Sequence, residues 1–214
     1  MKCSERLHSA AAGKEEIMNL WEYERAAWAE GAEIVCGVDE AGAGPLMGPV
    51  YAAAVILPRE ADIPGLNDSK KLTEKKREAL YEIITAQAAA WSVARVEAAE
   101  IDEMDILNAR MLAMQKALDG LTLRPDLALI DGNRDHGSRY AIEIPHRLIV
   151  GGDGKSASIA AASILAKVSR DRYVSTELDA KYPQYQFAKH KGYGTRLHYE
   201  MLDQYGPCPE HRRT

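Results

Sequence analysis

Residues 34–45 read Ile34-Val35-Cys36-Gly37-Val38-Asp39-Glu40-Ala41-Gly42-Ala43-Gly44-Pro45, so a short apolar strand runs directly into two adjacent acids and then into a glycine-rich turn. Neighbouring carboxylates at a strand end repel each other. A divalent cation reverses this penalty, because hard cations such as Mg2+ are held by carboxylate oxygens. The glycines allow backbone N–H groups to approach a phosphate or a sugar closely. Alone, an Asp-Glu-x-Gly tetrapeptide is more often a polar turn, so acids elsewhere in the chain decide between the two interpretations.

The chain of 214 residues suits one domain with a small appendage, because domains commonly contain roughly 50–250 residues. Its three cysteines, Cys3, Cys36 and Cys208, are widely spaced and odd in number, which favours a reducing, cytoplasmic location. No apolar run reaches the roughly 18 residues of a membrane span, so we expect no membrane association. The net charge of −5 argues mildly against a non-specific nucleic-acid binder, although basic clusters at Lys70-Lys71 and Lys189-His190-Lys191 leave the partner open.

Strand and helix patterns alternate along the chain after an opening hairpin. We expect an N-terminal helical extension over residues 1–33, docked or free, and an α/β body over residues 34–214. Strands 34–38 and 50–57 are expected to pair antiparallel, because a short Gly/Pro-rich loop joins them. The alternation indicates a mixed central β-sheet flanked by helices, with a C-terminal helical segment. The other expected strands are 91–97, 127–130, 140–144 and 146–150, and the expected helices are 73–89, 101–118, 156–180 and 195–205.

Further acids lie where predicted elements end or begin. Asp131 ends the strand 127–130 and Asp153 precedes the long helix; taken singly, each is equally well a turn or cap residue. Asp171 lies within that helix and is expected to pair with its neighbours on a solvated face. Taken together, Asp39, Glu40, Asp131 and Asp153 all fall at element ends, which is the usual location of sites in α/β sheets.

These four acids predict a metal centre. If the two central strands are parallel neighbours, Asp39 and Asp131 meet at one edge of the sheet. Carboxylates a few ångströms apart cannot all ionise unless cations neutralise them. Two Mg2+ ions about 3.5–4 Å apart would satisfy them and would clamp the attacking water and the leaving oxygen of a phosphoryl displacement.

Two other kinds of site are excluded by pattern. Gly154-Lys155-Ser156 follows a strand and opens a helix, but a P-loop requires glycine at position 149, where this chain has Ile149. The sequence also lacks the G-x-S-x-G elbow that presents a nucleophilic serine. A nucleotide triphosphatase and a serine hydrolase are therefore poor interpretations.

Several longer motifs stand in a fixed order along the chain. They are Gly37-Val38-Asp39-Glu40-Ala41-Gly42 with Gly44-Pro45-Leu46, Leu66-Asn67-Asp68-Ser69-Lys70-Lys71-Leu72-Thr73, Ile106-Leu107-Asn108-Ala109, Ala160-Ala161-Ala162-Ser163-Ile164-Leu165-Ala166-Lys167-Val168, His190-Lys191-Gly192-Tyr193-Gly194-Thr195 and His211-Arg212-Arg213. In this order, over about residues 33–213, they resemble the ribonuclease HII family, the type 2 ribonucleases H. The run Ile159–Arg172, which contains the Ala-rich motif, is highly specific.

The resemblance implies an RNase H-like catalytic domain and metal-dependent cleavage of RNA in RNA–DNA hybrids, including at single ribonucleotides embedded in duplex DNA. It implies that Asp39, Glu40, Asp131 and Asp153 are the catalytic, metal-binding acids, which are the same four that their positions single out. The implied cofactor is Mg2+ or Mn2+ in a two-metal site, and the implied products carry a 3′-hydroxyl and a 5′-phosphate. We expect a cytoplasmic monomer that acts in ribonucleotide excision repair.

The resemblance also assigns substrate contacts. The backbone of Gly42-Ala43-Gly44 corresponds to the family's reader of the 2′-hydroxyl, which is both donor and acceptor. Tyr193 corresponds to the aromatic that packs on the deoxyribose after the ribonucleotide; without the resemblance it would be a loop anchor. Ser69 and Lys70 are implied phosphate contacts, and Lys191 is expected to act similarly. His190 receives no role, because a single histidine in a basic loop is usually only a surface residue.

One departure from the family pattern weakens substrate binding in this interpretation. The family's turn normally reads Gly-Arg-Gly, whereas this chain has Ala43 in the middle. The missing guanidinium removes a charge-assisted phosphate contact, typically worth about 1.5–3 kcal/mol. A hybrid-binding protein with weakened catalysis is therefore an alternative, and another metal nuclease on the same fold is a third. The four acids favour an enzyme, and the Gly42–Gly44 turn with Tyr193 favours ribose sensing.

Overall fold

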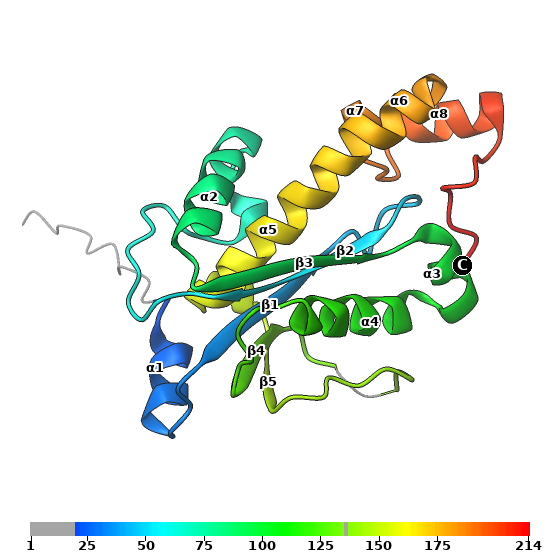
Figure 1. The fold of residues 1–214 in the computed structure, drawn as a ribbon. Helices are drawn as coiled ribbons and strands as arrows, with labels where there is room; N and C mark the ends of the chain where they lie inside the picture. Colours follow the sequence, from blue (N-terminus) through cyan, green and yellow to red (C-terminus); the bar gives the residue numbers. More distant parts are fainter. Residues whose placement is uncertain (1–19, 135–136) are drawn as a thin grey trace, which may run out of the picture.

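The computed structural model describes residues 20–134 and 137–214 (Figure 1). Within these residues the strands form one mixed sheet in the order β3-β2-β1-β4-β5. β2 pairs antiparallel with β1 and β3, and β4 pairs parallel with β1 and β5. The predicted opening hairpin and mixed α/β sheet are therefore confirmed. The strands are β1 (Val35–Ala41), β2 (Val50–Ile56), β3 (Ala90–Val96), β4 (Leu127–Asp131) and β5 (His146–Ile149).

Helices cover both faces of this sheet, as Figure 1 shows. α5 (Ala157–Tyr173) packs on β1 and β2 from one face, and α4 (Ile106–Asp119) packs on β2 and β3 from the other. α2 (Glu74–Gln87) lies beside α5. Every residue of β2 is buried, because a strand covered on both faces has no polar side to present to water.

The long helix continues past α5, as the Ala-rich pattern predicts. α5 lies close to β1, because Gly37 presents no side chain to the helix backbone at Ser158 and Ile159. Beyond α5 the chain stays helical through a wider π-helical segment and a last short turn, so the helix predicted over 156–180 is confirmed with one irregular stretch. These two pieces are Val174–Leu178 and α6 (Asp179–Lys181).

Two predicted elements differ from the structure. The periodicity over 101–118 predicts one helix, but the chain breaks at Asp105, whose φ of 76° is left-handed, and forms α3 (Ala98–Met104) before α4. The Asp105 side chain then accepts a hydrogen bond from the Asn108 N–H and starts the second helix. The strand expected over 140–144 is not formed in the described residues, and this segment packs on the apolar core instead.

The C-terminal region is a small helical layer around aromatic and histidine side chains. The expectation that His190 is a surface residue is wrong, because it is buried, its Nε2 lies 2.9 Å from the Tyr185 carbonyl oxygen and its ring stacks on His198 with centroids 4.3 Å apart. A basic sequence neighbourhood did not reveal this, since the burial comes from packing against Phe187. The helical pieces here are Pro183–Tyr185, α7 (Phe187–His190) and α8 (Arg196–Tyr205).

The described part of the N-terminal extension docks on the body. In α1 (Glu22–Ala29), the buried Glu24 carboxylate accepts hydrogen bonds from the Ser156 hydroxyl at 2.6 Å and the Ser158 N–H at 2.9 Å. These partners lie at the start of α5, so α1 caps that helix from outside. Of the extension predicted over 1–33, residues 1–19 lie outside the described residues.

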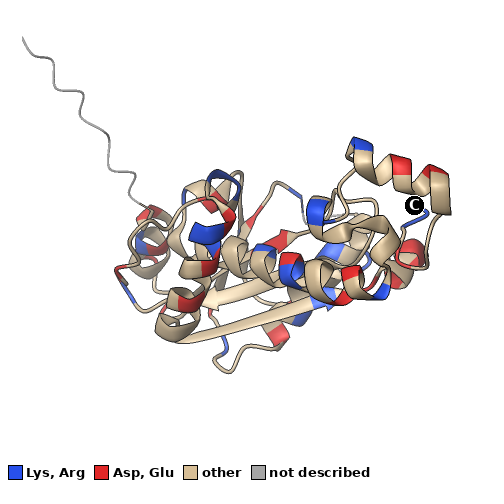
Figure 2. Ribbon diagram, turned by 90° about the horizontal axis from the view of Figure 1, so that it is seen from above, with Lys and Arg blue, Asp and Glu red and all other residues tan. Residues whose placement is uncertain are grey.

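Charged residues of both signs are interspersed along the helices, so the net charge of −5 does not gather on one face in the view of Figure 2. In the described part of the chain, no helix has the length and apolar character needed to cross a membrane.

Candidate active site

The ends of neighbouring strands bring three of the predicted acids together. Asp39 lies near the end of β1, and Asp131 is the last residue of β4, the parallel neighbour of β1. Asp153 lies in the 3-10 turn Gly152–Gly154, which follows β5. One carboxylate oxygen from each of Asp39, Asp131 and Asp153 lies within 4.8 Å of the other two. The convergence expected from parallel neighbouring strands is therefore present.

Glu40 lies beside this cluster and is only half satisfied. Its Oε1 lies 2.5 Å from an Nη2 of Arg110 in α4. Its Oε2 is buried and has no hydrogen-bond partner within the described residues. A buried carboxylate oxygen without a donor is costly, and a cation beside it would supply the missing partner.

Burial and nearby negative charges raise the pKa values of Asp39, Glu40 and Asp131. Burial raises the pKa of Asp39 well above its ordinary value, and the charges of Glu40 and Asp131 raise it further. Burial also raises the pKa of Glu40 against the opposing charge of Arg110. It raises the pKa of Asp131 too, although the Gly152 N–H donates a 2.7 Å hydrogen bond to Asp131 Oδ1. All-oxygen donors that repel one another in this way fit a hard divalent cation.

Lys70 provides the local positive charge. Its Nζ lies 3.0 Å from Asp153 Oδ2, and its side chain is 74% exposed. Burial alone would lower the pKa of Lys70, but the hydrogen bond and charge of Asp153 outweigh that effect and raise it. The 3-10 turn Ser69–Lys71 that carries this lysine is anchored, because the Ser69 hydroxyl lies 2.6 Å from the Ser163 hydroxyl in α5.

A cavity of about 210 Å³ opens beside the acids. It brings together the end of β1, the glycine turn, the Ser69–Lys71 turn, α5 and the loop before α8. Its lining contains most of the residues predicted to touch substrate. Asp153 is not part of the lining but lies next to it, beside Asp39, Asp131 and Lys70. The lining residues are Asp39, Glu40, Ala41, Gly42, Ala43, Gly44, Ser69, Lys70, Asp131, Ser163, Lys167 and Tyr193.

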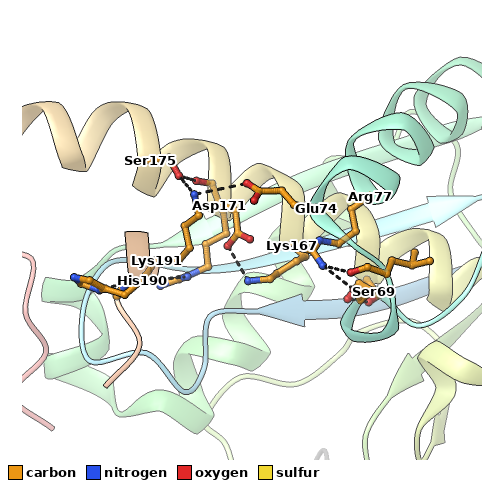
Figure 3. A network of polar contacts seen from close by, with 12 residues as sticks. Ser69, Glu74, Arg77, Lys167, Asp171, Ser175, His190 and Lys191 are labelled. Atoms are coloured by element: carbon orange, nitrogen blue, oxygen red, sulfur yellow. Dashed lines mark hydrogen bonds and ion pairs between the residues drawn. The ribbon is translucent and has the colours of Figure 1, made fainter. Parts of the chain in front are cut away.

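Lys191 is the predicted substrate residue that does not line this cavity. Figure 3 shows its side chain directed toward Ser175, with which it hydrogen-bonds, and Glu74, 3.7 Å away. Its Nζ is therefore shared with a hydroxyl and a carboxylate at the edge of α2 and α5. A phosphate contact by Lys191 remains a prediction that requires the side chain to leave these partners.

The sequence interpretation assigns no role to Ser163 and Lys167, which line the cavity, or to Arg110, which pairs with Glu40. Ser163 and Lys167 follow one another at i,i+4 spacing on α5, and Lys167 Nζ lies 2.8 Å from Asp171 (Figure 3). The expected pairing of Asp171 is present, but the expected solvated face is wrong, because Asp171 is buried. The i,i+4 spacing was a usable signal for Lys167. Arg110 gave no local signal, because its partner Glu40 is 70 positions earlier in the chain.

Adding Mn2+ to metal-free protein is expected to raise its melting temperature by about 5–10 °C at 100-fold excess over Kd. Ions must displace protons from carboxyl groups whose pKa values are raised, so the shift is expected to be larger at pH 8 than at pH 5.5. Differential scanning fluorimetry after EDTA treatment measures both shifts, with NaCl of equal ionic strength as control. No shift at pH 8 would contradict the metal site.

Comparisons with known proteins agree with this geometry. The family model described as ribonuclease HII matches residues 36–214. Ribonuclease HII of Caldicellulosiruptor bescii is 53% identical over 197 residues, covering 92% of this chain and 93% of the relative. Ribonuclease HII of Neisseria meningitidis serogroup C is 56% identical over 182 residues, covering 84% and 91%.

A solved structure extends the likeness to the fold. The ribonuclease H2 of Pyrococcus horikoshii superposes with a TM-score of 0.68 at 28% identity, covering 84% of this chain and 92% of that one. The chain therefore belongs to the ribonuclease HII family of metal-dependent endoribonucleases.

Proposed function

We propose that this protein cleaves RNA–DNA hybrids and duplex DNA that contains a single ribonucleotide, cutting on the 5′ side of the ribonucleotide. The observation that carries the proposal is one cavity that joins the acidic cluster to a turn with free backbone donors. The N–H groups of Ala43 and Gly44 have no hydrogen-bond partner among the described residues. Unpaired donors beside a phosphate-cleaving centre suit a 2′-hydroxyl, which DNA lacks. We further propose that the protein acts as a monomer.

The four acids are proposed to hold two divalent ions, Mg2+ or Mn2+. When bound, such ions would supply a nucleophile from water and stabilise charge on the phosphate. Asp39, Asp131 and Asp153 each offer an oxygen to the same place, and Glu40 offers its unpartnered Oε2. Water adds to phosphorus, and the 3′-oxygen of the nucleotide before the ribonucleotide leaves and takes up a proton. This gives a 3′-hydroxyl on that nucleotide and a 5′-phosphate on the ribonucleotide.

The other lining residues are proposed to orient the substrate. Ser69 and Lys70 line the cavity, and Lys70 Nζ lies 3.0 Å from Asp153, so both residues are proposed to contact a phosphate. Tyr193 is 40% exposed, so its ring is available to pack against a sugar. Lys167 lies 5.2 Å from the centre of that ring and adds positive charge to the same wall.

A labelled DNA duplex with one ribonucleotide tests the proposal beside an all-DNA duplex of the same sequence, both incubated with Mg2+. Cleavage of the first duplex alone, 5′ to the ribonucleotide, supports it. Binding without cleavage would instead support a hybrid-binding protein, and cleavage of both duplexes would support a nuclease that does not sense ribose.

The Ala43 side chain motivates the weakened-catalysis alternative and a prediction. We expect Ala43→Arg to raise kcat/KM on the single-ribonucleotide duplex about tenfold, because a guanidinium at this point of the cavity adds a charge-assisted phosphate contact. Ala43→Met, which adds length without charge, is the matched control and should not raise it. Equal kcat/KM values for Ala43→Arg and the wild type would show that the missing arginine at position 43 does not lower the activity on this duplex.

A further inference from the structure

The glycine turn is held from behind by one guanidinium. The Arg212 side chain donates five hydrogen bonds, and all five go to backbone carbonyls within residues 42–48. Nη2 donates to Gly42 at 2.7 Å, and Nη1 donates to Ala43 and Pro45 at 3.1 Å each. Nε and Nη2 both donate to Gly48, at 2.9 and 2.7 Å. A planar fork with five N–H donors suits this arrangement, and an ammonium group could not span it.

The backbone around Arg212 fixes where that guanidinium lies. Met47 and His211 form an antiparallel bridge, so the C-terminal segment pairs with the glycine loop like a short strand. Gly48 N–H donates to the Glu210 carbonyl at 2.8 Å, and Arg212 N–H donates to the Leu46 carbonyl at 2.9 Å. These backbone hydrogen bonds fix the position of Arg212 relative to the glycine loop, so its side chain is held close to the carbonyls that it contacts.

Carbonyls that point toward Arg212 determine where the neighbouring N–H groups point. In a trans peptide unit the carbonyl of one residue and the N–H of the next point in opposite directions. Leu46 illustrates this, because the Pro45 carbonyl faces Arg212 while the Leu46 N–H donates to the Gly192 carbonyl at 2.9 Å. By the same geometry, the Gly42 and Ala43 carbonyls direct the N–H groups of the two residues that follow them away from Arg212. Both of those residues line the cavity.

A second arginine ties this turn to the opposite wall of the cavity. Arg170 in α5 is fully buried and donates to the carbonyls of Met47 at 3.1 Å, Pro49 at 3.1 Å and Lys191 at 3.0 Å. It therefore joins the end of the glycine loop to the loop that carries Tyr193. Burial, together with the repulsion between the two guanidiniums, lowers the pKa of Arg212 to about 10. Placing two like charges under one loop is costly, and the carbonyls between them offset that cost.

We propose that Arg212 is a positioning residue for ribose recognition: by holding the Gly42 and Ala43 carbonyls, it aims the N–H groups of Ala43 and Gly44 at the 2′-hydroxyl of the substrate. The inference rests on the proposed function. It also explains how the turn reads ribose with alanine in its middle, because the donors belong to the backbone and their direction is set by Arg212.

The test compares binding to two DNA duplexes that differ in a single 2′-hydroxyl, measured as Kd with Ca2+ in place of Mg2+ and with the absence of cleavage checked. The ratio of the two Kd values is the ribose preference. We expect Arg212→Met and Arg212→Lys each to reduce this preference about tenfold, because both leave the carbonyls unheld while the lysine keeps the charge. Arg213→Met is the matched control, since it removes the same charge from the next, exposed residue and should keep the full preference.

Melting temperature and the Mn2+-induced shift are recorded for each variant, so that a loss of folding is recognised. Should Arg212→Met fail to fold, Arg212→Lys carries the test alone. A full ribose preference in Arg212→Lys overturns the proposal, and so does an equal loss of affinity for both duplexes. If the wild type binds the two duplexes with equal Kd, the proposed function is wrong and the inference about Arg212 is wrong with it. If the wild type prefers the ribonucleotide duplex and Arg212→Lys keeps that preference, only the inference about Arg212 is wrong.

Discussion

An Asp39→Asn variant is expected to lose cleavage activity by a factor on the order of 10³ or more in kcat/KM, because the change removes a carboxylate oxygen from the proposed metal site. Asparagine has nearly the same shape, so β1 and its register with β4 should be retained. Cleavage of the single-ribonucleotide duplex under single-turnover conditions measures the loss. Retained activity would contradict the assignment of Asp39.

The same variant should be more stable than the wild type in EDTA. The pKa of Asp39 is raised in the folded state, so the native protein binds this proton more tightly than the unfolded chain does. The wild type therefore loses stability as pH rises from the ordinary carboxyl range toward the folded pKa, and the asparagine variant does not. The difference in melting temperature should be largest at pH 8 and should shrink toward pH 5.

The control for both measurements is Asp62→Asn, because Asp62 is exposed in the loop after β2 and belongs neither to the acidic cluster nor to the cavity lining. It should keep the activity and the Mn2+-induced rise in melting temperature. We expect only Asp39→Asn, and not Asp62→Asn, to lose activity and gain stability. This combination indicates a carboxylate that binds metal but destabilises the metal-free protein.

The sequence was sufficient to predict the acidic cluster, because each acid marks the end of an element. Asp39 and Asp131 follow apolar strands, and parallel neighbouring strands end at the same edge of a sheet. The direction and the neighbour relation of those strands had to be assumed, and the structure supplies them. Glu40 differs, because its contact with Arg110 depends on how α4 crosses the sheet, which no local pattern encodes.

Two of the wrong sequence-based predictions, the unbroken helix over 101–118 and the exposed His190, have the same physical cause. The helical periodicity over 101–118 runs through Asp105, whose left-handed backbone is rare for a residue other than glycine and leaves the apolar spacing on both sides intact. The basic residues around His190 suggest solvent, whereas its ring is buried against Phe187 and His198. In both cases tertiary packing decided the outcome, and periodicity and composition describe only the local chain.

The role of Arg212 also could not be predicted from the local sequence, although the motif that contains it was recognised. The motif His211-Arg212-Arg213 was visible in the sequence, but its two arginines look alike there. The structure separates them, because Arg212 reaches four carbonyls of a loop some 165 positions earlier while Arg213 is exposed. A residue that acts through a distant backbone has no spacing rule by which a sequence could reveal it.

A Gly37→Ala variant is expected to be destabilised by at least about 3 kcal/mol, at the upper end of what overpacking usually costs. The added Cβ would lie 2.0 Å from the Ser158 carbonyl carbon and 2.2 Å from the Ile159 nitrogen. Both are backbone atoms of α5, so no side-chain rotation relieves the clash and the helix has to move off the sheet. For a domain of this size the melting temperature should fall by roughly 6–12 °C in a thermal scan.

Gly44→Ala is the matched control, because a Cβ there meets no atom within 4 Å and the melting temperature should stay within about 2 °C of the wild type. A Gly37→Ala protein that melts like the wild type would show that α5 can shift without loss. Moving α5 also moves its start, which directly follows the turn that carries Asp153. The variant should therefore also show a smaller Mn2+-induced rise in melting temperature, because the third carboxylate no longer lies within reach of the other two.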